Sequence, residues 1–156
     1  MKKIAIVFFV LFAGCLSATA QEKLSAEDSR AIQDCIKQKT GSNNGSAESC
    51  IGIVANPCLD TPDGQSTLGQ SECYRREQLV WDDILNETYR RLQGQLEGKL
   101  KMGLRDVQRA WIESRKLQCG FYRDVIQGTM AIPIGASCYN TETARRALYL
   151  LSLLEL

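Results

Sequence analysis

The sequence predicts an all-α fold, a disulfide-stapled bundle of about five helices, of which two are short and three are longer. In every long segment, apolar residues recur three and four residues apart, which is the spacing of one helix face. No stretch alternates apolar and polar residues as a half-buried strand does. An even number of cysteines follows an apolar N-terminal leader, so we expect covalent cross-links in an exported chain.

The leader has the composition of a secretory signal peptide over residues 1–20. Lys2 and Lys3 form its basic start, Ile4–Phe12 its apolar centre, and Ala18–Ala20 a small-residue cleavage site. The apolar run is too short to span a membrane. We therefore expect a periplasmic or secreted protein.

A second interpretation of the leader gives a different product. The stretch Phe12–Cys15 approximates a lipoprotein cleavage box, although it begins with Phe where such a box usually has Leu. Cleavage there would leave Cys15 as a lipidated N-terminus, and the protein would be a membrane-anchored lipoprotein.

Cleavage after Ala20 leaves 136 residues, 21–156, which is the size of a single domain. The mature chain has 17 basic and 18 acidic residues, so its net charge is −1. A near-neutral chain gives no reason to expect nucleic acid as a partner. The charge is uneven, with −3 over residues 21–71 and +2 over residues 72–156.

Six cysteines remain in the mature chain, and an even number in an exported protein predicts a disulfide framework. The chain has no histidine and no C-x-x-C motif, which argues against zinc, and we expect neither a metal nor another cofactor. The cysteines are Cys35, Cys50, Cys58, Cys73, Cys119 and Cys138.

The first two predicted helices form a short hairpin. Ser25 caps a helix that runs to Lys39, a polar turn follows, and a second helix extends from about Ala47 to Ala55, before Pro57. Reflection about the turn centre at Asn43 places Cys35 opposite Ile51, so Cys50 is its natural partner.

A polar turn over Leu59–Thr67 leads to the first long helix, which brings Cys58 and Cys73 close together. The pairs 35–50 and 58–73 each close a loop of 15 residues, worth about 3 kcal/mol in the chain-entropy model. The main alternative crosses these four cysteines as 35–58 and 50–73.

Two long antiparallel helices come next, the first over about Thr67–Leu96 and the second continuing past Cys119 to about Ile126. Gly94, Gly98 and Gly103 mark the weakened turn between them.

An apolar loop is then expected over Gly128–Ser137, closed by a Cys119–Cys138 bridge. Asn140 or Thr141 caps the last helix. Its core-facing residues are Ala144, Ala147, Leu148, Leu151 and Leu154.

The two long helices carry mixed polar and aromatic faces. Gln108, Trp111 and Arg115 lie three and four residues apart, so they share one helix face. A face that combines an aromatic ring with two polar groups predicts a hydrogen-bonded network that locks helix register. The alternative is a polar ligand site lined by Asn86, Tyr89, Gln108 and Arg115. We expect Trp81 and Trp111 to be core aromatics.

The pattern Leu-Asn-x-x-Tyr-x-x-Leu at 85–92, followed by Gln-Arg-Ala-Trp-Ile-x-x-Arg-x-x-x-Cys at 108–119, resembles the LprI-type lysozyme inhibitor N-terminal domain family. The resemblance covers roughly Cys50–Leu151 and includes Thr143 and Arg146. It implies a small exported helical domain whose partner is lysozyme. Its motif and structural residues are Trp81, Leu85, Asn86, Tyr89, Gln108, Arg109, Trp111 and Arg115.

The chain offers no residue pattern for catalysis, so we do not expect an enzyme. Without histidine there is no Ser-His-Asp or Cys-His arrangement, and no glycine-rich phosphate loop occurs. Asp82 and Asp83 are adjacent on a helix and point about 100° apart, so they do not face each other.

Surface loops are the expected partner-binding elements. Asp60 and Asp63 lie on an acidic turn, and Ile132, Pro133 and Ile134 lie in the apolar loop. We expect an exported protein-binding module that inhibits lysozyme by blocking its cleft with these loops. The alternative is a cell-envelope structural or assembly protein that makes no contact with lysozyme.

Overall fold

The computed structural model of the protein describes residues 24–41 and 45–156, and every regular element in these two ranges is helical. The all-α prediction is therefore confirmed. The predicted signal peptide, Cys15 and the turn centre at Asn43 lie outside the described residues. The α-helices are α1 (Ala26–Thr40), α2 (Ala55–Leu59), α3 (Thr67–Gln95), α4 (Gly98–Val125) and α5 (Ala131–Leu153), and the 3-10 helices are η1 (Ala47–Cys50) and η2 (Asp63–Gln65).

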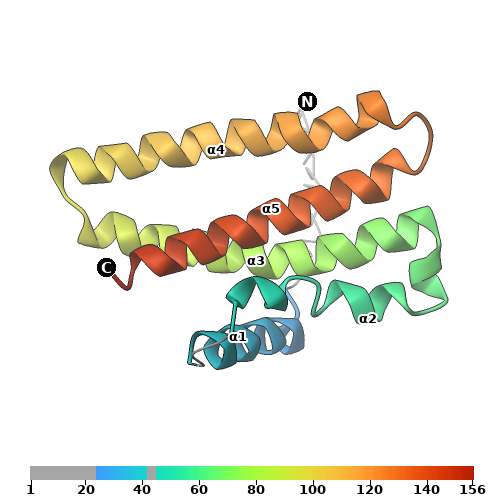
Figure 1. Ribbon diagram of the computed structural model, residues 1–156, viewed down its shortest axis with the longest axis horizontal. Coiled ribbons are helices and arrows are strands. Elements are labelled where there is room, and N and C mark those ends of the chain that lie inside the picture. Colours follow the sequence, from blue (N-terminus) through green and yellow to red (C-terminus); the bar gives the residue numbers. More distant parts are fainter. Residues whose placement is uncertain (1–23, 42–44) are drawn as a thin grey trace, which may run out of the picture.

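Helices α3, α4 and α5 form the body of the molecule, as Figure 1 shows. The last helix, α5, packs extensively on α3 and less extensively on α4. Helices α3 and α4 have few contacts with each other and are joined at one end by a short turn. Helix α4 is therefore held mainly through α5, while α1, η1 and α2 pack against the other helices.

Helix α1 begins as its sequence predicts. The Ser25 side chain accepts a hydrogen bond from the backbone N–H of Asp28, and Glu27 and Asp28 lie in the first turn, where the helix dipole favours acids. Ile32 is fully buried and anchors this helix in the core.

The predicted helix over Ala47–Ala55 is wrong. The chain forms the short 3-10 helix η1, breaks at Gly52, and begins α2 at Ala55. Gly52 has a φ of 96°, a left-handed conformation that interrupts a right-handed helix. Pro57 does not end a helix here but lies in the first turn of α2, where a backbone N–H has no intrahelical acceptor.

The two long helices are confirmed, with ends close to those predicted. Gly98 has a φ of 52° and starts α4, so it makes the sharp reversal possible. Gly94 and Gly103 instead lie inside helices, so the turn is confined to Leu96 and Glu97.

The predicted apolar loop over Gly128–Ser137 is also wrong, because α5 begins at Ala131. Pro133 is the third residue of this helix, a position that tolerates proline. Asn140 is not a cap, since it lies in the middle of α5 and is buried. The expected core face of this helix is confirmed, because Ala144 and Ala147 are fully buried against the core cluster.

The predicted disulfide pairing is confirmed, and the crossed alternative is wrong. Cys35 pairs with Cys50, Cys58 with Cys73 and Cys119 with Cys138. The Cα–Cα distances are 5.9, 5.6 and 5.5 Å, all within the usual range for a disulfide. Within the described ranges, no helix has both the length and the apolar character needed to cross a membrane.

Candidate functional site

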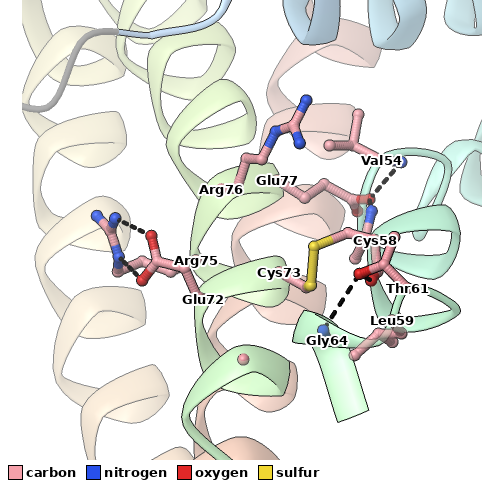
Figure 2. The surroundings of a disulfide bond; sticks show 12 residues. Val54, Cys58, Leu59, Thr61, Gly64, Glu72, Cys73, Arg75, Arg76 and Glu77 are labelled. Carbon is pink, nitrogen blue, oxygen red and sulfur yellow. Dashed lines mark hydrogen bonds and ion pairs between the residues drawn. A yellow bond between two sulfur atoms is a disulfide. The ribbon is translucent and has the colours of Figure 1, made fainter. Parts of the chain in front are cut away.

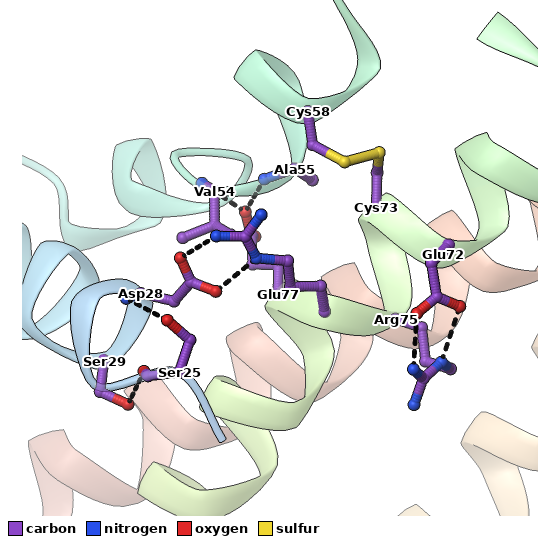
Figure 3. A network of polar contacts seen from close by, with 11 residues as sticks. Ser25, Asp28, Ser29, Val54, Ala55, Cys58, Glu72, Cys73, Arg75 and Glu77 are labelled. Carbon is purple, nitrogen blue, oxygen red and sulfur yellow. Dashed lines mark hydrogen bonds and ion pairs between the residues drawn. A yellow bond between two sulfur atoms is a disulfide. The ribbon is translucent and has the colours of Figure 1, made fainter. Parts of the chain in front are cut away.

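A buried carboxylate, Glu77 of α3, organises the polar part of the core. Its side chain is fully buried and accepts hydrogen bonds from the backbone N–H groups of Gly52, Val54 and Ala55, at 2.7, 2.9 and 2.8 Å. Figure 3 shows the bonds from Val54 and Ala55. The Trp81 indole N–H and the Asn140 amide also donate to it, at 3.1 and 3.0 Å.

This arrangement gives Glu77 a structural role. The donors come from the break between η1 and α2, from α3 and from α5, so one carboxylate holds three segments together. A carboxylate that is closed off from solvent and fully used by internal donors has no access to a substrate. Glu77 was not among the predicted site residues, although an acid four residues before Trp81 on a largely apolar helix face was an available signal.

Asp28 and Arg76 join α1 to α3 beside this carboxylate. The Arg76 guanidinium donates to both carboxylate oxygens of Asp28, and the Nη2–Oδ1 distance is 2.6 Å. This hydrogen bond raises the pKa of Arg76 above its ordinary value. Asp28 is buried, whereas the Arg76 side chain is half exposed, so the pair lies at the edge of the core.

The predicted face of Gln108, Trp111 and Arg115 is assembled at the contact between α4 and α5. Arg115 Nη1 donates to Thr143 Oγ1 at 2.6 Å, and its guanidinium lies 4.5 Å from the centre of the Trp111 ring. Arg146 Nε donates to Gln108 Oε1 at 2.8 Å. These contacts support the predicted network that locks one helix against the other.

The Arg146 guanidinium lies near Trp111 and Tyr149, at 5.6 and 5.0 Å from the ring centres. Burial lowers its pKa. No carboxylate within the described ranges pairs with Arg115 or Arg146, so aromatic faces and neutral acceptors surround both cations.

The other motif residues do not join this network. Trp81 and Leu85 are core residues, and Tyr89 packs partly buried against the same core. Asn86 is exposed and donates to Asp82 at 3.1 Å, while Arg109 is exposed on α4. The four polar residues considered as a ligand site therefore do not line one site, because Asn86 lies on a solvent-facing side of α3.

The two predicted partner-binding segments lie at the same end of the molecule. We call this the cystine end: η2, the start of α3, the end of α4 and the start of α5, with the Cys58–Cys73 and Cys119–Cys138 bridges (Figure 1). Asp60 and Asp63 are exposed there, and Ile132 is 56% exposed. The sequence predicts these two segments separately, and the fold places them at the same end of the molecule.

The acidic turn of this end is held in place covalently and by hydrogen bonds. The Cys58–Cys73 bridge ties it to α3, and the backbone N–H of Gly64 donates to Thr61 Oγ1 at 3.1 Å (Figure 2). Gly64 lies so close to Cys58 that an added Cβ would come within 2.2 Å of its carbonyl oxygen. The turn is thus a defined surface.

A groove of about 350 Å³ at the cystine end lies where α3, α4 and α5 meet. Pro133 and Ile134 line it, so two of the three residues from the predicted apolar loop contribute to a helix-borne groove. Pro133 is buried and Ile134 is partly exposed. The other helices contribute Gln70, Tyr74, Gln118 and Tyr122.

The fold defines a small helical protein that is stapled by three disulfides within the described ranges. The family model described as Lysozyme inhibitor LprI matches residues 58–150. The chain belongs to this family, as the sequence resemblance predicts. No curated protein and no solved structure matches the chain significantly.

The disulfides and the family together indicate an extracytoplasmic location. The family match begins at Cys58, so α1 and η1 precede the matched region. The Cys35–Cys50 bridge joins these two elements to each other. The Asp28–Arg76 ion pair and the hydrogen bond from Gly52 to Glu77 attach them to α3.

Proposed function

We propose that the protein is a non-enzymatic lysozyme inhibitor that blocks the lysozyme cleft with its cystine end. Membership in the LprI family is the observation that carries this proposal. The burial of Glu77 supports the non-enzymatic part, because that carboxylate is occupied by structural hydrogen bonds. We further propose that the mature chain begins after Ala20 and is periplasmic or secreted, with a lipid anchor at Cys15 as the alternative.

The charge of the acidic turn suits a lysozyme as partner. Lysozymes are typically basic, and Asp60 and Asp63 present two exposed carboxylates on a restrained turn. Exposed charges of opposite sign steer the encounter of two proteins and accelerate association. The acidic turn would therefore bring the inhibitor to lysozyme.

The apolar part of the same end would hold the complex together. Ile132 is largely exposed in the first turn of α5, and Ile134 lines the adjacent groove. Pro133 between them is buried and fixes the local backbone. An apolar side chain on a rigid element loses little conformational entropy on binding, so it is an effective anchor.

Turbidity of a bacterial cell-wall suspension is the direct test of this function. Added lysozyme clears the suspension, and the purified mature protein should slow clearing in proportion to its concentration. The same protein after reduction and alkylation of its disulfides is the matched control and should inhibit poorly. If the native protein neither slows clearing nor binds immobilised lysozyme, the inhibitor function is wrong and the envelope-assembly alternative takes its place.

A further inference from the structure

Helix α4 carries a long apolar seam that no described part of the chain covers. The spacing between successive seam residues is alternately three and four positions, which is the heptad spacing of helices that pack against another helix. Its large side chains are 51–72% exposed. The seam consists of Leu100, Gly103, Val107, Ala110, Ser114, Leu117 and Phe121.

The seam is separate from the face that α4 buries. Gln108 and Cys119 point towards α5 and are buried, whereas Val107 and Leu117 are open to solvent. Helix α3 approaches α4 mainly near their connecting turn, so it leaves the seam open along most of its length (Figure 1). No seam residue is charged.

We propose that a second copy of the same chain covers this seam, with the two α4 helices packed antiparallel. The register that overlaps the seams most fully places Val107 of one copy against Leu117 of the other. Gly103 then lies opposite Phe121, and Ala110 lies opposite Ser114. The smallest residue thus faces the bulkiest one, and two small residues meet at the centre.

This pairing is self-complementary, as a two-fold dimer requires, because every contact occurs twice. With Val125 included, the large seam side chains leave roughly 600 Å² of apolar surface open on one copy, and two copies would cover on the order of 1,200 Å². That area is at the lower end of specific protein interfaces. A monomer seldom exposes a continuous apolar patch of this size.

The charges beside the seam are compatible with a second copy because both signs are present. In the same register, Asp106 of one copy lies within about two residues, or about 3 Å along the axis, of the level of Lys116 of the other. Glu113 has the same relation to Arg109. A flank of one sign would instead repel its own copy.

Sedimentation equilibrium of the mature protein tests the proposal. The wild type should change from monomer to dimer as its concentration rises. Val107→Glu and Leu117→Lys should each remain monomeric, because each places a charge in the apolar seam. The double variant should regain dimer, since in this register each new carboxylate faces a new ammonium group of the other copy.

Recovery of the dimer in the double variant distinguishes the proposed register from other arrangements. In a parallel pair, each introduced carboxylate would face the same carboxylate of the other copy. The double variant would then stay monomeric, which would overturn the antiparallel dimer. A wild type that is monomeric at every concentration would overturn the second copy altogether. Circular dichroism checks that each variant remains folded.

A pair of glycine variants gives a matched control. An added Cβ meets no atom within 4 Å at either Gly103 or Gly120, so both Gly→Ala changes fit the monomer. Each should raise the thermal midpoint, because alanine favours a helix over glycine. Only Gly103→Ala should weaken dimerisation, by on the order of tenfold, because it narrows the recess for Phe121. Equal dimer affinities for the two variants would contradict the register.

Lysozyme is the other possible occupant of the seam. If the wild type stays monomeric and Leu117→Lys abolishes lysozyme binding, the seam belongs to the lysozyme contact and the second-copy proposal is wrong. If the protein dimerises and both single variants still inhibit lysozyme, the seam serves the dimer and the cystine end remains free for the partner.

Discussion

Glu77 shows how much one side chain contributes to this small fold. Its carboxylate accepts hydrogen bonds from three backbone groups in the stretch 52–55, where the chain has no regular helix to satisfy them. Without these bonds, several buried N–H groups would lack an acceptor, and each such group costs about 1–3 kcal/mol. The carboxylate therefore replaces secondary structure at the junction between η1 and α2.

Glu77→Gln should lower the free energy of unfolding by about 3 kcal/mol, because one oxygen acceptor becomes an amide donor that faces other donors. Glu87→Gln is the matched control, since Glu87 is exposed on the same helix. That variant should change stability by less than about 0.5 kcal/mol. Urea unfolding followed by circular dichroism measures both, and similar midpoints would contradict the role of Glu77.

Arg115→Ala should destabilise the fold by about 1–3 kcal/mol, because it removes the bond to Thr143 and the stacking on Trp111. Arg145→Ala is the control and should cost within about 0.5 kcal/mol. Arg145 is largely exposed and contacts only exposed or partly exposed acids, Glu142 at 3.2 Å and Glu48 at 4.0 Å. Thermal unfolding compares the two variants, and identical midpoints would refute the network.

Helical spacing was sufficient to predict some of these side-chain contacts. It placed Gln108, Trp111 and Arg115 together because residues three and four apart always share a face. It could not predict Glu77 as a hub, because the backbone donors lie 22–25 residues away in the chain and the Asn140 donor lies 63 residues away. The place of Glu77 on an apolar helix face indicates burial, but only the fold shows which groups donate to it.

At the scale of elements, the predictions failed where proline or glycine was assumed to have only one structural role. Pro57 was expected to follow the end of a helix and Pro133 to lie in a loop, yet each lies in a first helical turn. The start of α5 shows the consequence, because Ile132 and Ile134 now project from a helix. A binding residue on a helix is held more rigidly than one on a loop.

The acidic turn leads to a kinetic prediction. Asp60→Asn with Asp63→Asn should slow association with immobilised lysozyme, and the difference should shrink as salt screens the charges. Asp83→Asn with Glu87→Gln changes the same charge on exposed residues of α3 and should alter association less. Binding kinetics at two salt concentrations measure the effect. Equal loss in both double variants would show that only net charge matters.

The apolar start of α5 should act on the lifetime of the complex. Ile132→Ser with Ile134→Ser should speed dissociation, because an apolar anchor that loses water on binding contributes mainly to the dissociation rate. Met102→Ser removes an exposed apolar side chain near the start of α4 and should leave the lifetime unchanged. An unchanged dissociation rate in the isoleucine variant would place the anchor elsewhere.

At the scale of the whole molecule, the disulfide pairing followed from chain order, because each pair joins cysteines that flank a reversal of the chain. The open seam of α4 could not be predicted from the sequence in the same way. Periodicity finds an apolar face but cannot tell which of two such faces meets the rest of the chain. That depends on how far α3 and α4 diverge over α5, which is a tertiary property.

The same pairing determines what a protease can separate. A single cut between α4 and α5 leaves both pieces joined through Cys119–Cys138, and a cut in the turn at Leu59–Ser66 leaves them joined through Cys58–Cys73. The connection at Leu96 and Glu97 is bridged by no disulfide within the described ranges. Limited digestion followed by a non-reducing gel should therefore release fragments only from cuts outside the three bridged loops, such as cuts near that connection or in the stretch between Cys50 and Cys58. Nicks at the cystine end should appear only after reduction, so this end, where we propose that the partner binds, would stay in one covalent piece after it has been cut.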